Sequence, residues 1–303
     1  MAQPQVQYEQ SLEPRAYLAK AIKFVGGKGF FGDLNNSITE MTPYHSALYW
    51  RFLYEKCGGM TNGSHLPQVG MRVIRQTMSL LYSRKVVDIH ASSDLVANLP
   101  EIMDQVLASP AANACPFRSY AGSLAHFSQA IYGLRLEGGL CPAPESANSC
   151  GFYDPKKLYS QPSSANLVYS GEGTNFSAQD QPYPAGIRNS FGMDFVEISL
   201  APEANTRPVR IEIHGESGSP ARFVVQVWKI SDHSQDQNGQ AGTPSSLPVE
   251  VLTQADPEAG LVYEIPAGEL EAYQRLAVII TRVDAFERDD PIGAYRLEVS
   301  PGS

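Results

Sequence analysis

The chain has 303 residues, of which 43% are hydrophobic and 18% are charged, a composition typical of folded rather than disordered or fibrous proteins. Its 32 acidic and 23 basic residues give a formal net charge of −9. Such a charge does not attract phosphate backbones or anionic lipid surfaces, so we expect no nucleic acid partner. No stretch approaches the roughly 18 consecutive apolar residues of a membrane-spanning helix, so we expect no membrane-spanning segment.

The N-terminal segment 1–14 is polar, with neither the basic nor the apolar region of a secretion signal. We therefore expect either an intracellular protein or a chain whose biological start lies upstream.

At roughly 150 residues per domain, the length predicts about two domains.

The cysteines favour a chain whose biological start lies upstream over an intracellular protein. All four lie in the first half of the chain, at Cys57, Cys115, Cys141 and Cys150. Their spacing is not that of a structural zinc site. The even count, and the short polar loop between Cys141 and Cys150, favour two disulfides, Cys57 with Cys115 and Cys141 with Cys150, over free buried thiols. Disulfides indicate an oxidising compartment, so we expect an extracellular or periplasmic protein.

Residues 1–137 have the pattern of a helical domain. Thr42 and Pro43 are a helix start signal, because proline at the first helical position gives up a backbone N–H that has no partner in the helix. We predict a helix over 44–56 that ends at Gly58, where glycine can adopt the left-handed conformation.

Apolar residues at helical spacing predict three further helices in this domain, over 68–83, 94–108 and 118–134. We expect the helix over 94–108 to break near Leu99, because Pro100 disfavours helical geometry in the residue before it. Together the predicted helices would form one packed layer.

The pattern changes after the helical domain. Residues 138–190 are rich in Gly, Pro, Ser and Asn, which predicts a long connector lying across both halves. From residue 191 the apolar residues alternate with polar ones, which indicates strands. The predicted strands are 193–200, 209–213, 222–229, 249–252, 261–265, 276–282 and 295–299.

These strands predict an antiparallel β-sandwich over residues 191–303, with one face of each sheet packed inward and the other exposed to water. The predicted fold class is therefore multi-domain α and β, with an N-terminal all-α helical domain followed by an antiparallel β-sandwich. Trp228 lies within a predicted strand, and we assign it to the core rather than to an exposed sugar-binding platform.

Recognised catalytic motifs are absent from the sequence. No H-E-x-x-H occurs, and we interpret His45 and His126, both on predicted helices, as structural. Ser123 lacks the second glycine of a nucleophile elbow, and the glycine-rich segment 24–32 fits no phosphate-binding pattern. We therefore expect no catalytic residue, no metal ligand and no cofactor.

The segment Asp232–Gly239 has the oxygen-bearing side chains of half a calcium loop. Ser245 stands where such a loop would need its closing acidic residue. The same residue types are common in hairpin loops, so we favour a solvated hairpin and keep calcium binding as the alternative.

Several segments carry a family resemblance: Tyr44–Gly58 (YHSALYWRFLYEKCG), the helix around Val73 and Ile74, Leu124–Tyr132 and the strand Phe191–Leu200. They resemble the C-terminal half of the catalytic domain, and the following β-sandwich, of secreted zincin-type metallopeptidases of bacteria. In that family the zinc ligands and the general base precede the matched segments, and residues 1–31 supply none of them. The resemblance therefore implies a truncated or degenerate relative, onto which no catalytic residue carries over.

These observations favour a non-catalytic, metallopeptidase-like protein whose β-sandwich binds a protein or polysaccharide surface. The alternative is a hydrolase, a peptidase or an esterase, with a non-standard site between the helical domain and the sandwich, lined by Tyr153, Asp154 and Tyr159. A structural subunit of a larger assembly is the third interpretation.

Overall fold

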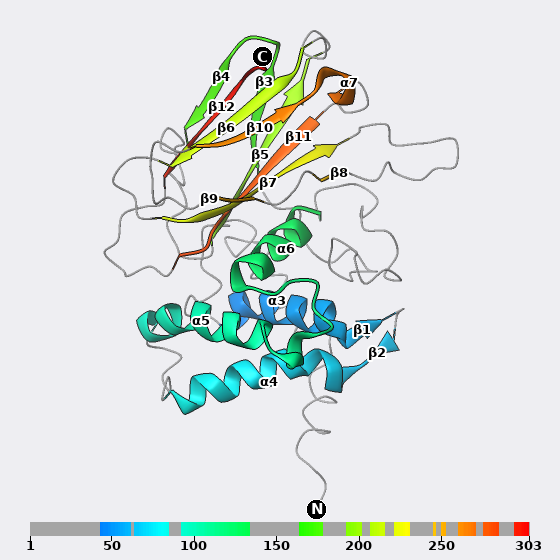
Figure 1. The fold of residues 1–303 in the computed structure, drawn as a ribbon, viewed down its shortest axis with the longest axis vertical. Helices are drawn as coiled ribbons and strands as arrows, with labels where there is room; N and C mark the ends of the chain where they lie inside the picture. The colour runs from blue at the N-terminus through cyan, green and yellow to red at the C-terminus, as the bar shows by residue number, and fades with distance from the viewer. Residues whose placement is uncertain are drawn as a thin grey trace, which may run out of the picture.

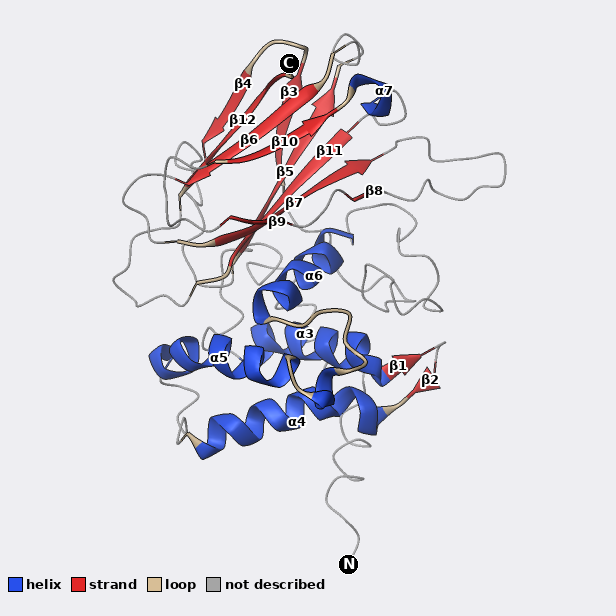
Figure 2. Ribbon diagram, viewed as in Figure 1, coloured by secondary structure: helices blue, strands red, loops and turns tan. Residues whose placement is uncertain are grey.

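The computed structural model describes residues 43–61, 64–84, 92–133, 164–177, 192–201, 207–215, 221–230, 245–246, 250–252, 260–270, 275–284 and 294–302. Apart from the short helix α7 (Ala267–Leu270), the described helices lie in the N-terminal half, and the two large sheets lie in the C-terminal half (Figures 1 and 2). Among the described helices, none combines the length and the apolar character needed to cross a membrane.

The helical layer consists of α3 (Pro43–Tyr54), α4 (Pro67–Ser83), α5 (Ser92–Leu107) and α6 (Tyr120–Gly133). A π-helical turn, η1 (Glu55–Gly59), follows α3, and a 3-10 turn, η2 (Pro110–Ala112), follows α5. The short strands β1 (Met60–Thr61) and β2 (Ser64–His65) pair between η1 and α4, so the predicted helical domain is not purely α.

The predicted break near Leu99 is wrong, because α5 continues through Pro100. Leu99 is buried on one side of the proline, and Ile102, Met103 and Val106 are buried on the other. Burial of apolar side chains on both sides keeps the two halves in one helix, although proline cannot donate the backbone hydrogen bond.

Two β-sheets make up the C-terminal half. The six-stranded sheet has the order β3 (Ala165–Tyr169), β5 (Met193–Leu200), β11 (Arg275–Arg282), β7 (Phe223–Ile230) and β8 (Ser245–Ser246), and β9 (Glu250–Leu252) also pairs with β7. The four-stranded sheet has the order β10 (Leu261–Ile265), β6 (Val209–Gly215), β12 (Tyr295–Pro301) and β4 (Thr174–Ser177). A short helix, α7 (Ala267–Leu270), follows β10.

Each strand predicted from residue 191 onward has a counterpart in the sheets. The structure adds β3 and β4, which lie inside the predicted connector and form one edge strand of each sheet. Because β3 pairs with β5 in parallel, the sandwich is not wholly antiparallel.

The two sheets pack face to face on an apolar core. Alternate side chains of β5 point to opposite faces of the sheet. Val196 and Ile198 belong to the core between the sheets, whereas Phe195 belongs to the core shared with the helices. All eight residues of β7 are buried. The expectation that one face of each sheet is exposed to water is therefore wrong for the central strands of the six-stranded sheet, since α6 packs against the other face of β7 and β11. In the edge strand β3, Val168 is 68% exposed.

The contact between α6 and the six-stranded sheet is a packed core. The ring of Tyr132 lies 5.3 Å from that of Phe195 and 5.7 Å from that of Trp228, measured between centroids. Gln226 Nε2 donates a 2.8 Å hydrogen bond to the backbone carbonyl of Ala125 in α6. The helices and the six-stranded sheet thus share one hydrophobic core.

Candidate binding surface

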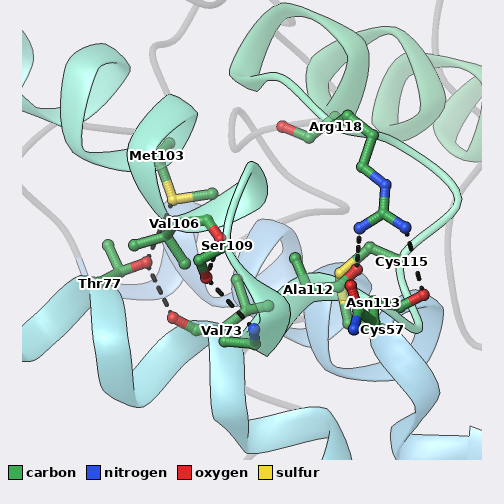
Figure 3. Close-up of a disulfide and its surroundings, with 12 residues drawn as sticks. Cys57, Val73, Thr77, Met103, Val106, Ser109, Ala112, Asn113, Cys115 and Arg118 are labelled. Carbon is green, nitrogen blue, oxygen red and sulfur yellow. Dashed lines mark hydrogen bonds between the residues drawn. A yellow bond between two sulfur atoms is a disulfide. The ribbon is translucent and has the colours of Figure 1, made fainter.

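The disulfide between Cys57 and Cys115, the first of the two predicted pairings, is present in the structure (Figure 3). It joins η1 to the segment after η2, across 58 residues of chain, and both cysteines are buried. Cys141 and Cys150 lie outside the described residues, so their pairing stays a prediction.

Backbone contacts fix the chain around this disulfide. Gly58 has a φ of 91°, the left-handed conformation predicted for the end of the first helix. Arg118 donates a hydrogen bond of 2.8 Å to the carbonyl of Ala112, and Ser109 Oγ accepts one of 3.3 Å from the N–H of Ala111 (Figure 3). These contacts assign the disulfide a structural role.

Ser123 lies in the interior of the helical layer. Its Oγ donates to the carbonyl of Tyr120 at 2.7 Å and lies 2.6 Å from the Tyr49 hydroxyl, in fully buried surroundings. Burial raises the pKa of Tyr49 far above its usual value of 10. A buried serine held by a carbonyl and a neutral tyrosine is a structural hydrogen-bond centre rather than an accessible nucleophile.

A small group of titratable side chains lies where α3 meets α6. Burial lowers the pKa of Lys56 to about 8, although the nearby Glu55 carboxylate opposes this shift. Glu55 also accepts a 2.7 Å hydrogen bond from Arg51 Nε. His126 lies 5.5 Å from the Phe117 ring, and its pKa is lowered by burial and by the charge of Lys56. The side chain of the other predicted helical histidine, His45, is outside the described residues.

At the described junction between helices and sandwich, α6 and the six-stranded sheet share buried apolar residues. Among the polar groups of this junction is Glu197, which accepts hydrogen bonds from the Tyr132 hydroxyl at 3.1 Å and from Arg275 Nη1 at 3.5 Å. Trp228 is 3% exposed, which confirms its assignment to the core. The predicted lining residues of a hydrolase site, Tyr153, Asp154 and Tyr159, lie outside the described residues.

The calcium alternative for Asp232–Gly239 also lies outside the described residues. Within the part of the chain that the structure describes, no three His, Cys, Asp or Glu residues are grouped so that they could hold a metal ion.

The outer face of the four-stranded sheet carries a group of partly exposed charges. We define this outer face as the residues of β6, β10 and β12 that point away from the core between the sheets. They are Arg210, Glu212, His214, Val262, Glu264, Arg296, Glu298 and Ser300.

Strand register arranges these residues in rows across the sheet. In one row Glu212 lies between Val262 and Glu298. In the next row Arg210 lies between Glu264 and Ser300. On the other side of Glu212, His214 is paired with Arg296. The charge therefore changes from row to row along the strands, at a spacing where neighbouring side chains interact.

Ion pairs along β6 and β12 hold their charges in place. Glu212 accepts a hydrogen bond from Arg210 Nε through one carboxylate oxygen and lies 3.3 Å from His214 Nε2 through the other. These two contacts hold the pKa of Glu212 below its usual range, with the Arg210 bond as the larger cause. Arg296 Nη2 donates to Glu298 at 3.1 Å.

Gly260 makes room for the imidazole at this surface. A Cβ built at Gly260 would lie 2.4 Å from Cε1 of His214, so the ring occupies the space that a side chain would need.

The alternation of Val209–Gly215 in the sequence could have identified the outward residues of β6. No signal in the sequence identified the strand register that forms the rows.

Comparisons with known proteins leave the family of this chain open. No family model matches the chain, and no curated protein matches it. Solved structures with some likeness include PliG, a periplasmic inhibitor of g-type lysozyme from Aeromonas hydrophila (10% identity, 46% of this chain and 96% of that chain, TM-score 0.22). A second is the surface-associated copper-binding protein CorA of Methylomicrobium album BG8, with 7% identity over 46% of this chain and 98% of that chain and a TM-score of 0.25. A third is the pre-peptidase C-terminal domain of a Bacillus anthracis collagenase, with 10% identity over 47% of this chain and 100% of that chain and a TM-score of 0.20. At these TM-scores the function has to be argued from the chain's own residues.

Proposed function

We propose that this chain is a non-catalytic binding protein whose outer face of the four-stranded sheet contacts a partner protein. One observation carries the proposal. The central strands of the six-stranded sheet, β5, β7 and β11, are covered on both faces, whereas the outer face of the four-stranded sheet presents charges held by ion pairs. Rigid, complementary charges determine the partner and the register of docking more than they determine raw affinity.

The chemistry of this face favours a protein over a polysaccharide. Its described outward residues include two arginines, three glutamates and a histidine, but no tryptophan, tyrosine or phenylalanine on which a sugar ring could stack. Guanidinium and carboxylate groups form paired hydrogen bonds with side chains of opposite charge. A partner protein with complementary charges fits this pattern.

The disulfide between Cys57 and Cys115 supports an oxidising compartment, and we propose an extracellular or periplasmic location. The descent of the helical part from a zincin-type catalytic domain is likewise a proposal, and it rests on the sequence resemblance. The hydrolase alternative stays a prediction, because Tyr153, Asp154 and Tyr159 lie outside the described residues.

The test uses the full chain as an immobilised bait for proteins extracted from the surface of the source cells, followed by affinity measurement with the purified partner. Glu298→Arg reverses a charge within the outer face, whereas Glu172→Arg makes the same change at an exposed turn between β3 and β4. We expect Glu298→Arg to weaken binding at least tenfold, about 1.4 kcal/mol, and Glu172→Arg to leave it unchanged. Equal affinities of the two variants would contradict the proposal.

Two further measurements separate the alternatives. Depletion of the chain by insoluble polysaccharides, with no captured protein, would favour a polysaccharide ligand. Stoichiometric zinc in the purified protein, or turnover in a panel of peptidase and esterase substrates, would favour the enzyme alternative.

A further inference from the structure

The outer face of α4 is a second surface with the composition of an interface. The helix buries Gly70, Val73, Thr77 and Leu81 in the helical layer. At 100° per residue the opposite side is centred on Arg75. We define the α4 outer face as the residues on this side, which are Gln68, Met71, Arg72, Arg75, Met78, Ser79 and Tyr82.

Large apolar side chains are exposed on and beside this face. Tyr82 is 77% exposed and Met78 is 43% exposed, and Leu66, immediately before the helix, is also 43% exposed. They make up three of the five exposed large apolar residues found among the described residues. Tyrosine, methionine and arginine are enriched in protein interfaces relative to the rest of the surface.

The charge of the α4 outer face is opposite to that of the chain as a whole. The helix contains arginines and no acidic residue, in a chain of net charge −9. Arg72 and Arg75 are exposed, and neither forms an ion pair with any described residue. Arg84, just after the helix, differs from them because it pairs with Glu101 of α5 at 2.8 Å. A partner that contributes carboxylates would supply the counter-charges that Arg72 and Arg75 lack.

The spacing of this face suits a partner helix. Met71, Arg75, Met78 and Tyr82 follow one another at intervals of four, three and four residues. This is the spacing of the seam along which two helices pack, and an arginine within the seam needs a carboxylate opposite. A second copy of α4 would present the same arginines and no carboxylate, so it would not supply these counter-charges.

We propose that the α4 outer face is a docking surface for an acidic amphipathic helix of another protein. Recognition of an anionic membrane uses clusters of roughly four to eight basic residues, more than this face carries. The helix α4 lies on the side of the helical layer away from the sandwich (Figure 1). It is therefore separate from the outer face of the four-stranded sheet, and the chain could join two partners.

The test measures binding of the full chain to two synthetic helical peptides of equal length. Both carry leucines in a heptad seam, flanked by glutamates in one peptide and by lysines in the other. We expect the glutamate peptide to bind at least tenfold more tightly than the lysine peptide. Arg75→Glu should weaken the glutamate complex at least tenfold, and Tyr82→Ser should weaken it through loss of apolar contact.

Matched controls keep folding and the first proposal separate from this one. Arg222→Glu makes the same charge reversal at an exposed position before β7 and should leave peptide binding unchanged. Glu298→Arg, which tests the other surface, should also bind the glutamate peptide as the original chain does. Circular dichroism of each variant verifies that the helices are intact.

Three outcomes would overturn the proposal. The first is equal binding of the two peptides, or binding that survives Arg75→Glu. The second is binding to vesicles of one part phosphatidylglycerol and three parts phosphatidylcholine that Arg75→Glu abolishes, without peptide binding, since this would assign the face to a membrane. The third is a dimer in light scattering that Tyr82→Ser dissociates, since this would assign it to a second copy.

Discussion

Gly58 is a position where the backbone conformation restricts the residue type. Its φ of 91° is unfavourable for residues with a Cβ, and an added Cβ would lie 2.9 Å from Cγ1 of Val69. We predict that Gly58→Ala lowers the free energy of unfolding by about 1 to 3 kcal/mol, measured by urea titration. Gly173→Ala is the control, because a Cβ there meets no atom within 4 Å. Equal stability of the two variants would contradict this account.

Lys56 should make stability depend on pH in the alkaline range. Its pKa is about 8 in the folded protein, against 10.5 for a solvated lysine, so the unfolded chain binds more protons between these values. The contribution of Lys56 to the free energy of unfolding therefore rises as pH increases from about 8 to 10.5. Below a pH of about 8 the burial of the charged amine is fully destabilising.

Lys56→Met isolates this effect, because methionine does not titrate. At a pH of about 7 we predict that the variant is more stable than the original chain, and that its advantage shrinks as pH rises toward 10.5. Urea titrations of both proteins at intervals of pH measure the difference. A stability difference that stays constant with pH would show that Lys56 is not desolvated as described.

At the residue scale the candidate surfaces could be predicted only in part. Alternation along 209–213 indicates that Arg210 and Glu212 face away from the core. Their proximity to Glu298 depends on pairing between β6 and β12, strands separated by about 80 residues of chain, for which local pattern carries no information. Likewise, helical periodicity identifies the buried side of α4 but not whether another layer covers the opposite side.

At the scale of elements, the disulfide ties η1 to the segment after η2. Closing a loop of 58 residues reduces the entropy of the unfolded chain, which corresponds to about 4 kcal/mol in the chain-entropy model. We predict that replacing both Cys57 and Cys115 by serine lowers the free energy of unfolding by about this amount. Reduction of the original protein should produce a comparable loss, and a loss below about 1 kcal/mol would contradict the prediction.

The elements themselves were predicted to different degrees. The strands from residue 193 onward follow from period-two patterns, because their inward residues are apolar and β-branched. The strands β3 and β4 were missed because they are short and lie among Gly, Ser and Asn residues, and because tertiary pairing at the sheet edges rather than local propensity forms them. The near-continuous apolar run of β7 was the available signal that both faces of its sheet are buried.

At the scale of the whole molecule, the helical layer and the six-stranded sheet share one core, and this predicts cooperative unfolding. The sequence predicts separate domains over 1–137 and 191–303, joined by 138–190. In the structure Tyr132 of α6 packs between Phe195 and Trp228, so separating the helices from the sheet exposes apolar surface on both. Neither part can then unfold without destabilising the other.

The two tryptophans of the chain report on the two parts separately, since Trp50 lies in α3 and Trp228 in β7. In Trp228→Phe the remaining tryptophan is Trp50, whose fluorescence reports on the helices. In Trp50→Phe the remaining tryptophan is Trp228, whose fluorescence reports on the six-stranded sheet. Within each variant we predict that fluorescence and far-ultraviolet circular dichroism give the same urea midpoint, because helices and sheet unfold together. A tryptophan transition displaced from the dichroism transition would instead mean that the helical part and the sandwich unfold as independent domains, and that the packing of α6 on β7 and β11 contributes little to stability.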